Sequence, residues 1–303
     1  MSYHYLICEG EPDGLDVRLL DKVVAQYYGK DVEIVPARGD SGLKSVAEHY
    51  RVQLAQPEKQ PGYVSSSRQV FSVQDRNFRS PEEVQGSWKP GSKHFIWHRH
   101  EIENYLLDPR IIARLFDKLQ RVRSARSNRM PNGMEESSHF MRQLAEPMLE
   151  EHVGWLTYHY LVPRIWGQVD LRFKGPPKNR NQTWPRNDRQ SWLIHLNDEL
   201  RRLRNGCVAL ANSHNFSDDL IPDIYDGMLE QRKADGFWTK GQFLTEMGGH
   251  ELMSHLLEEM NKWWPKLNLG TLQSELLRAL DDLYAPYFFY PIDDFYELAQ
   301  RIE

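Results

Sequence analysis

Tyr3-His4-Tyr5-Leu6-Ile7-Cys8-Glu9-Gly10-Glu11-Pro12-Asp13 is a largely apolar run that ends in a cluster of acids around a glycine. Such a run predicts a buried strand, and Gly10 allows the tight turn that leads from a strand into a helix. Leucines and valines at helical spacing follow from Leu15 to Val24, and Gly29 ends this pattern. The chain therefore opens with a strand and a helix, the unit from which parallel sheets are built.

The same pattern returns further along the chain. Strands are expected at 3–8, 32–35, 69–73 and 94–97, with a helix after each of the first two and a polar connection over 77–90. The order strand, helix, strand, helix, strand, strand predicts an α/β fold with a small, mostly parallel sheet flanked by helices.

Acidic residues follow three of these strands. Glu9 follows the first, Asp75-Arg76-Asn77 follows the third, and Glu101-Ile102-Glu103 follows the fourth. The carboxyl ends of strands in an open α/β sheet meet at one crevice, where ligands bind. Carboxylates gathered there repel one another unless a cation holds them, and Mg²⁺ is a hard cation that prefers oxygen ligands. The spacing therefore predicts a metal site that serves phosphodiester chemistry.

Composition limits the other possibilities. The 303 residues carry a net charge of −5 and only two cysteines, Cys8 and Cys207, which argues against a disulfide framework and favours a reducing, cytoplasmic setting. We expect no membrane span, because no apolar run approaches the length that a bilayer requires. Cys8 lies inside a predicted strand, where a thiol is inert, and no Ser/His/Asp or Cys/His nucleophile pattern is found.

The character of the chain changes after Pro109. Helical patterns dominate, and we expect a first domain over 1–110 and a mainly α-helical domain for substrate or partner binding over 111–303. The expected helices cover 111–119, 140–161 with an interruption at Pro147, 190–204, 218–232, 249–262, 271–284 and 292–302.

Three segments in the first part resemble the metal-binding Toprim domain, in the form found in OLD-type (overcoming lysogenization defect) nucleases. Glu9-Gly10-Glu11-Pro12-Asp13 is similar to the Glu-Gly-x-x-Asp opening of that family, Asp75-Arg76-Asn77-Phe78 to its Asp-Arg-Asp-Phe element, and Glu103-Asn104-Tyr105-Leu106 to its Glu-Asn-Tyr-Leu segment. Gly248-Gly249-His250 is similar to a Gly-Lys that precedes a late helix in these chains. In its size and in lacking a P-loop motif, the chain most resembles the AriB-type effectors of PARIS anti-phage systems.

The resemblance implies an Mg²⁺- or Mn²⁺-dependent endonuclease. It assigns the metal to Glu9, Asp13, Asp75, Asn77 and Glu103, and catalysis to Glu9, Asp75, Glu103 and His250. It also implies a nucleic-acid substrate, RNA such as tRNA or else DNA, a separate ATPase chain as partner, and a homodimer as a further assembly. The effector would act as a toxin in abortive anti-phage defence.

Two departures from the family pattern keep a second hypothesis open. Asn77 stands where the family has an aspartate, and His250 where it has a lysine. An amide oxygen can bind Mg²⁺ but brings no charge, so the alternative is a catalytically inactive Toprim module that binds a partner ATPase.

Each candidate acid also has a structural interpretation. Glu9 and Glu103 suit the start of a helix, where the dipole favours a carboxylate, and Asp75 suits a turn. We interpret Glu11 and Asp16 as solvated acids of a first helical turn. His98 and His100 share one face of an extended chain and could begin a zinc site, although no third ligand is evident; with Arg99 they could instead contact a phosphate.

Two basic stretches leave a similar choice. Residues 172–192 carry six Lys and Arg residues interleaved with Trp184 and Trp192, and residues 121–129 carry four arginines. Cations contact phosphates and indoles stack on unpaired bases, so either stretch could form a nucleic-acid arm. A solvated loop is an equally good interpretation. Arg38-Gly39-Asp40-Ser41-Gly42 could cradle a phosphate at a helix start, although most such loops are turns.

Overall fold

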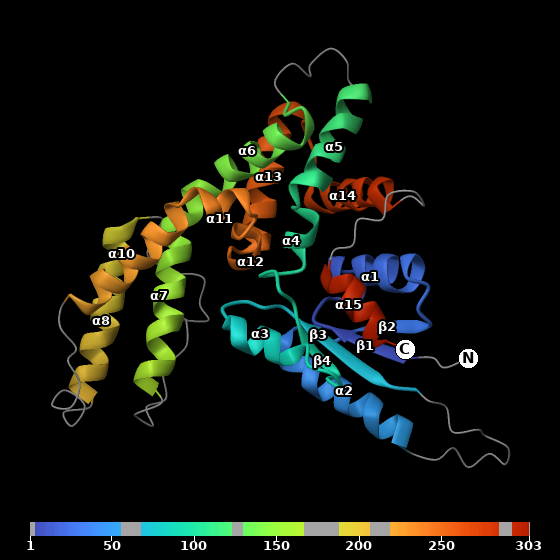
Figure 1. Cartoon of the computed structure of the whole chain (residues 1–303), viewed down its shortest axis with the longest axis horizontal. Coiled ribbons are helices and arrows are strands. Elements are labelled where there is room, and N and C mark those ends of the chain that lie inside the picture. Colours follow the sequence, from blue (N-terminus) through green and yellow to red (C-terminus); the bar gives the residue numbers. More distant parts are fainter. Residues whose placement is uncertain are drawn as a thin grey trace. The chain divides into compact units, whose positions relative to one another are not determined.

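The computed structural model describes residues 4–55, 68–122, 130–166, 188–206, 219–284 and 293–302, and its first part is built on a four-stranded sheet (Figure 1). The strands are β1 (His4–Cys8), β2 (Val32–Pro36), β3 (Val70–Gln74) and β4 (His94–Ile96). Their order is β2-β1-β3-β4, and each neighbouring pair is parallel. The predicted α/β class is confirmed.

Helices cover both faces of this sheet. One face carries α2 (Asp40–Ala55) and α3 (Pro81–Ser87); the other carries α1 (Leu15–Leu20), its π-helical continuation η1 (Asp21–Tyr27), and α15 (Asp293–Arg301) (Figure 1). Every residue of the central strand β3 is buried. Leu43 and Ala47 of α2 pack with Ile7, Val35 and Val70 in one core cluster, which is why the apolar runs of these strands show little alternation.

Helix α3 differs from the polar connection expected over 77–90. Ser80 Oγ accepts a hydrogen bond from the Glu83 N–H at 3.3 Å, and the Glu83 carboxylate accepts one from the Ser80 N–H at 2.8 Å. This reciprocal capping box, with Pro81 in the first turn, starts a helix. The sequence Ser80-Pro81-Glu82-Glu83 carries that signal, so the expectation of a connection without a helix was wrong.

The remaining described elements after β4 are helical, as predicted. They are α4 (Glu103–Leu106), α5 (Pro109–Val122), α6 (Gly133–Ala145), the 3-10 turn η2 (Glu146–Met148), α7 (Leu149–Trp166), α8 (Arg189–Gly206), α10 (Leu220–Lys233), α11 (Asp235–Thr239), α12 (Phe243–Glu246), α13 (Gly249–Trp263) and α14 (Leu269–Tyr284). Of the helices in the described ranges, none combines the length and apolar character that crossing a bilayer requires.

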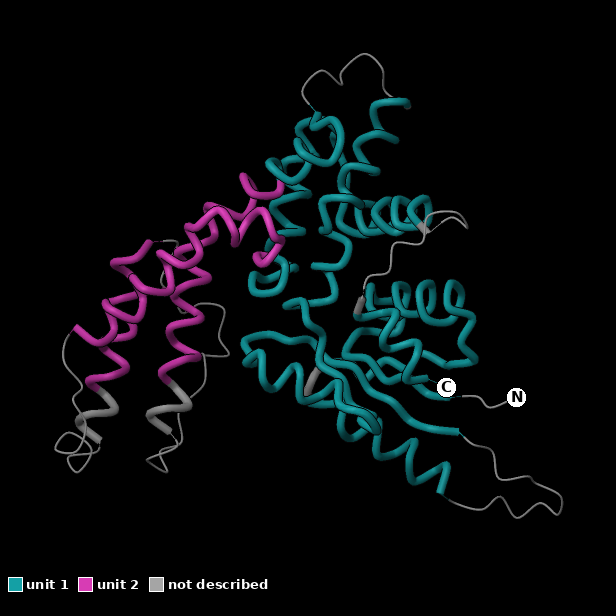
Figure 2. Tube along the Cα trace, in the orientation of Figure 1, with its two compact units in different colours: residues 1–140, 244–303 teal, residues 141–243 magenta. Residues whose placement is uncertain are grey.

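The chain forms two compact units, which do not divide at residue 110 (Figure 2). Unit 1 comprises residues 1–140 and 244–303, and unit 2 comprises residues 141–243. Residue 110 lies inside unit 1 because the helices that follow it pack with the end of the chain. Phe116 of α5 meets Phe140 and Trp263 edge-on, with ring centroids 5.4 and 5.9 Å apart. The C-terminal helices thus complete the unit that the N-terminal sheet begins.

Unit 2 is held by its own helix contacts. A Cβ built on Gly154 of α7 would lie 2.1 Å from the indole of Trp192, so only glycine lets α8 approach α7 this closely. Trp192 is fully buried as a result. Tyr225 of α10 donates a hydrogen bond of 3.0 Å to the Glu150 carbonyl oxygen.

Candidate acidic site at the carboxyl edge of the sheet

The ends of β1 and β3 bring two of the predicted acids into contact. Because the two strands pair in parallel, Glu9 and Asp75 follow neighbouring strands at the same edge of the sheet. The backbone N–H of Asp75 donates a hydrogen bond of 3.2 Å to Oε1 of Glu9. The predicted convergence of these two residues is therefore present in the fold.

The surroundings of Asp75 disfavour the charged form of its carboxyl group. Its Oδ1 atom is buried and has no hydrogen-bond partner among the described residues. Burial raises the pKa of the Asp75 carboxyl well above its ordinary value, and the negative charges of Asp16, Glu9, Glu103 and Glu101 raise it further. A buried carboxylate without a partner requires a proton or a cation.

Asp16 belongs to this cluster, contrary to the expectation that it is solvated. It is half-buried in the first turn of α1, and burial raises the pKa of its carboxyl. A Cβ built on Gly10 would lie 2.6 Å from Oδ2 of Asp16, so the side chain is folded over that glycine. Glu11 and Asp13 are exposed. Sequence spacing could not separate these three acids, because their burial depends on how α1 packs on the sheet.

Glu103 and Glu101 reach the cluster from the segment after β4, and their pKa values are shifted in opposite directions. Burial raises the pKa of Glu103 to about 7, with the charges of Glu101 and Asp16 adding to the effect. For Glu101, burial is outweighed by the His100 ring and the backbone N–H groups of His250 and Gly249, so its pKa is lowered. Glu101 is therefore the better ionised acid and is engaged in hydrogen bonds.

The start of α13 is the partner of Glu101. The His250 N–H donates to Glu101 Oε2 at 2.8 Å, which places a carboxylate at the positive end of a helix. A Cβ built on Gly249 would lie 2.3 Å from Asn104 Oδ1 and 2.9 Å from Glu103 Cβ. The His250 side chain is exposed, and its charge acts on Glu103. The segment Gly248-Gly249-His250 thus lies beside Glu101 and Glu103.

Residues 76 and 77 shape the edge through their backbone contacts. Asn77 has a φ of 49°, a conformation that asparagine tolerates, and its N–H donates to the His100 carbonyl oxygen at 3.0 Å. The Arg76 guanidinium donates to the carbonyl oxygens of His98 at 3.1 Å and Thr245 at 3.0 Å. Burial lowers the pKa of Arg76. Arg76 therefore joins the sheet edge to the segment before α13.

The carboxylate oxygens of this edge are the kind of donor that a hard cation prefers, but they are not arranged around one position as a set of ligands. Across the described part of the chain, no group of three or more His, Cys, Asp or Glu side chains is arranged to hold a metal ion directly. Glu9 and Glu101 instead accept backbone hydrogen bonds. The unpartnered Oδ1 of Asp75 and the all-carboxylate donor set fit Mg²⁺ or Mn²⁺. An ion shared by Glu9, Asp75 and Glu103 would therefore require these side chains to move from the positions they have in the structure.

Among the described residues, His98 and His100 are not part of a group of side chains that could hold zinc. His98 Nδ1 lies 2.8 Å from Asp294 Oδ1, whereas His100 is buried with Nδ1 3.4 Å from Glu101 Oε1. The two rings therefore have different partners. Arg99 is also engaged, since its guanidinium lies 2.8 Å from Asp108 Oδ2.

The two basic stretches lie largely outside the described residues, at 123–129 and 167–187. Trp192 and Arg189 from the end of the second stretch are described, and both have structural partners. Trp192 is buried on Gly154, and the Arg189 guanidinium is paired with Asp226, with Nε 2.5 Å from Oδ1. Neither is a free stacking or phosphate-binding group.

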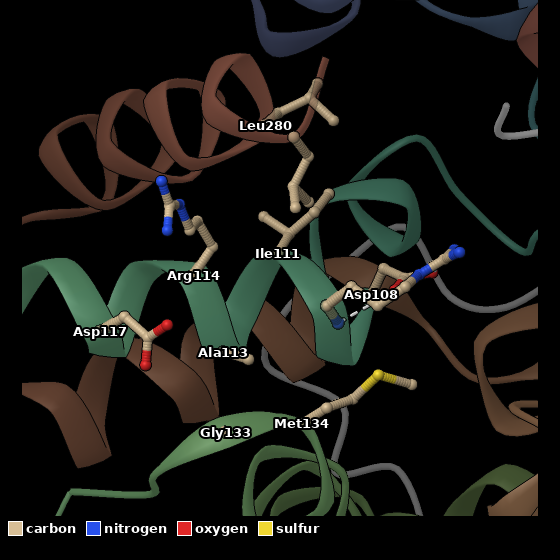
Figure 3. Close-up of a pocket in the computed structure, with 10 residues that line it drawn as sticks. Asp108, Ile111, Ala113, Arg114, Asp117, Gly133, Met134 and Leu280 are labelled. Carbon is tan, nitrogen blue, oxygen red and sulfur yellow. Dashed lines mark hydrogen bonds and ion pairs between the residues drawn. The ribbon is translucent and has the colours of Figure 1, made fainter. Parts of the chain in front are cut away.

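A separate cavity of about 400 Å³ lies among α5, α14 and the start of α6 (Figure 3). Ile111, Ala113, Met134 and Leu280 line it together with charged side chains such as Arg114. It contains no residue of the acidic site.

No protein-family model and no curated protein sequence matches this chain.

Proposed function

We propose that this chain is a divalent-metal-dependent nuclease with an OLD-like Toprim domain, and that it cleaves phosphodiester bonds of nucleic acid. The observation that carries the proposal is the buried, unpartnered Oδ1 of Asp75 among four other carboxylates at the carboxyl edge of a parallel sheet. Carboxylate oxygens of structural acids are normally paired or solvated, and Asp75 Oδ1 is neither. Perturbed acids at such an edge favour a functional site.

The residues of the site have separate roles in this proposal. Glu9, Asp75 and Glu103 hold the ion, Asp16 adds negative charge beside them, and Asn77 and Asp13 lie on the flanking turns. A bound Mg²⁺ or Mn²⁺ supplies Lewis-acid stabilisation of the charge that develops on a phosphoryl group. Glu101 fixes the start of α13, and with it His250, beside Glu103.

The substrate and the setting rest on the sequence resemblance alone. RNA, with tRNA as the first candidate, is the proposed substrate, and the role is that of a toxic effector restrained by a separate ATPase chain in anti-phage defence. The test uses the purified 303-residue chain with labelled tRNA and DNA, with Mg²⁺, Mn²⁺ or EDTA. Metal-dependent cleavage by the wild type and its loss in Asp75→Asn are expected.

A catalytically inactive binding module is the second candidate. It is favoured by the absence of a ready-formed ligand set among the described residues and by the neutral Asn77. Thermal melting separates the two candidates. We expect Mn²⁺ to raise the midpoint of the wild type and not that of Asp75→Asn. No metal effect on the wild type, together with no cleavage, would favour the binding module.

A further inference from the structure

His98 lies two residues after the end of β4, at the same edge of the sheet as the acids. The backbone of residues 97–100 runs beside residues 74–77, through two hydrogen bonds of 3.0 Å each. The second segment carries Asp75. A group on His98 is therefore placed next to the candidate site without belonging to the acid cluster.

The imidazole is held in one orientation by a single carboxylate. Asp294 of α15 accepts hydrogen bonds from the His98 backbone N–H at 3.0 Å and pairs with His98 Nδ1 at 2.8 Å. Tyr105, which is fully buried, donates its hydroxyl to the same Asp294 carboxylate. The ring also stacks on Trp88, with centroids 5.4 Å apart and planes at 27°.

The other ring nitrogen is available. Nε2 of His98 makes no hydrogen bond or ion pair with any residue that the structure describes, and 44% of the side chain is exposed. The hydrogen bond to Asp294 raises the pKa of His98 against the effect of burial; the charges of Asp294 and Glu297 also raise it, and that of Arg76 lowers it. Asp294 therefore orients the ring, and its outward nitrogen can donate a hydrogen bond when the ring is protonated.

We propose that His98 binds a phosphate of the nucleic-acid backbone, with its Nε2–H donating to a phosphodiester oxygen beside the acidic site, and that Asp294 is its positioning residue. The identity of the ligand rests on the proposed function. An imidazolium is suited to this contact because it offers both charge and a directed donor, and charge-assisted hydrogen bonds are the strong ones.

Binding can be measured apart from cleavage. A Glu9→Gln background in EDTA is titrated into labelled single-stranded RNA and DNA of one sequence, at about pH 6 and about pH 8.5, on either side of the ordinary histidine pKa. His98→Gln should weaken binding about threefold to tenfold at the lower pH and reduce the difference between the two pH values to the part that the titration of Glu103 accounts for. It should also reduce the salt slope by about one. Asp294→Asn should move the pH dependence to lower pH.

The matched control is His49→Gln on α2, an exposed histidine whose Nε2 lies 2.9 Å from Gln53 Nε2. It should change neither the affinity nor its pH dependence. If His98→Gln unfolds, the ring signals of His98 in the Glu9→Gln protein give a second measurement. They should shift on addition of the RNA oligonucleotide and, at higher concentration, of inorganic phosphate.

The inference is overturned if His98→Gln leaves the oligonucleotide affinity unchanged at both pH values, or if the ring signals of His98 do not move at saturating RNA. Failure of every oligonucleotide to bind has the same consequence. If the wild type cleaves in a metal-dependent way and His98→Gln binds the oligonucleotide as tightly as the wild type does, the proposed function stands and only the His98 contact is removed. If binding depends on His98 but no metal supports cleavage, the His98 contact stands and the proposed nuclease function is removed.

Discussion

The backbone N–H of Asp75 donates a hydrogen bond of 3.2 Å to Oε1 of Glu9, across 66 positions of sequence. This contact exists because β1 and β3 are parallel neighbours, with Tyr5 opposite Val70 at the start of the shared register. It joins the side chain of Glu9 to the backbone of Asp75, so a substitution at Glu9 also acts on the position of Asp75.

Glu9→Gln should abolish cleavage without unfolding the protein. The amide oxygen of glutamine can still accept the Asp75 N–H, whereas the negative charge needed to hold a cation is lost. We expect a rate reduction of at least about 100-fold, as for other electrostatic site residues, and a stability change below about 1 kcal/mol. Gel-based cleavage and thermal melts measure the two effects. Full activity in this variant would remove Glu9 from the site.

Asp16→Asn should reduce cleavage about tenfold, whereas Glu11→Gln should have no effect. Both acids follow β1, but Asp16 is half-buried over Gly10 and its charge acts on Asp75, while Glu11 is exposed. Loss of the Asp16 charge should also lower the pKa of Asp75. The pair of variants is assayed at matched metal concentrations. Equal behaviour of the two would mean that Asp16 has no part in the site.

The metal-free protein should lose stability as the pH rises through the range set by Glu103. Its carboxyl has a pKa of about 7 when folded and an ordinary value of 4.5, so between these values the folded state binds more protons than the unfolded state. The free energy of unfolding therefore falls as the pH rises from about 4.5 to about 7. Glu103→Gln should flatten this part of the melting profile, and saturating Mn²⁺ should raise the neutral end. A wild-type profile that rises across this range in EDTA would contradict the assignment.

Gly249→Ala should destabilise unit 1 by about 1–3 kcal/mol and reduce cleavage, because the new Cβ would lie 2.9 Å from the backbone nitrogen of Asn104 and 2.9 Å from Glu103 Cβ. Neither atom is the end of a flexible side chain. The control is Gly227→Ala in α10, where a Cβ meets nothing within 4 Å; it should stabilise the protein by about 0.5–1 kcal/mol. Denaturant unfolding of both variants measures the difference. A neutral Gly249→Ala would show that α13 does not pack tightly on the acids.

The sequence by itself determined the strands, most of the helices and the edge of the sheet that carries the acids. Apolar runs such as Val70-Phe71-Ser72-Val73 are long enough to specify buried strands, and parallel strands in an α/β order place their carboxyl ends together. The one missed helix among those that surround the sheet, α3, carried a local capping signal. Local chemistry was sufficient for these features because they depend on neighbours within a few residues.

Only the tertiary structure decided which acids are buried and what they contact. Asp16 and Glu11 belong to the same short acidic stretch, yet packing of α1 over Gly10 buries one and leaves the other in water. The bond between Glu101 and the start of α13, and the alignment of His98 by Asp294, each join segments more than a hundred positions apart. Burial and such contacts depend on how whole elements pack together, and no local pattern of residues records that.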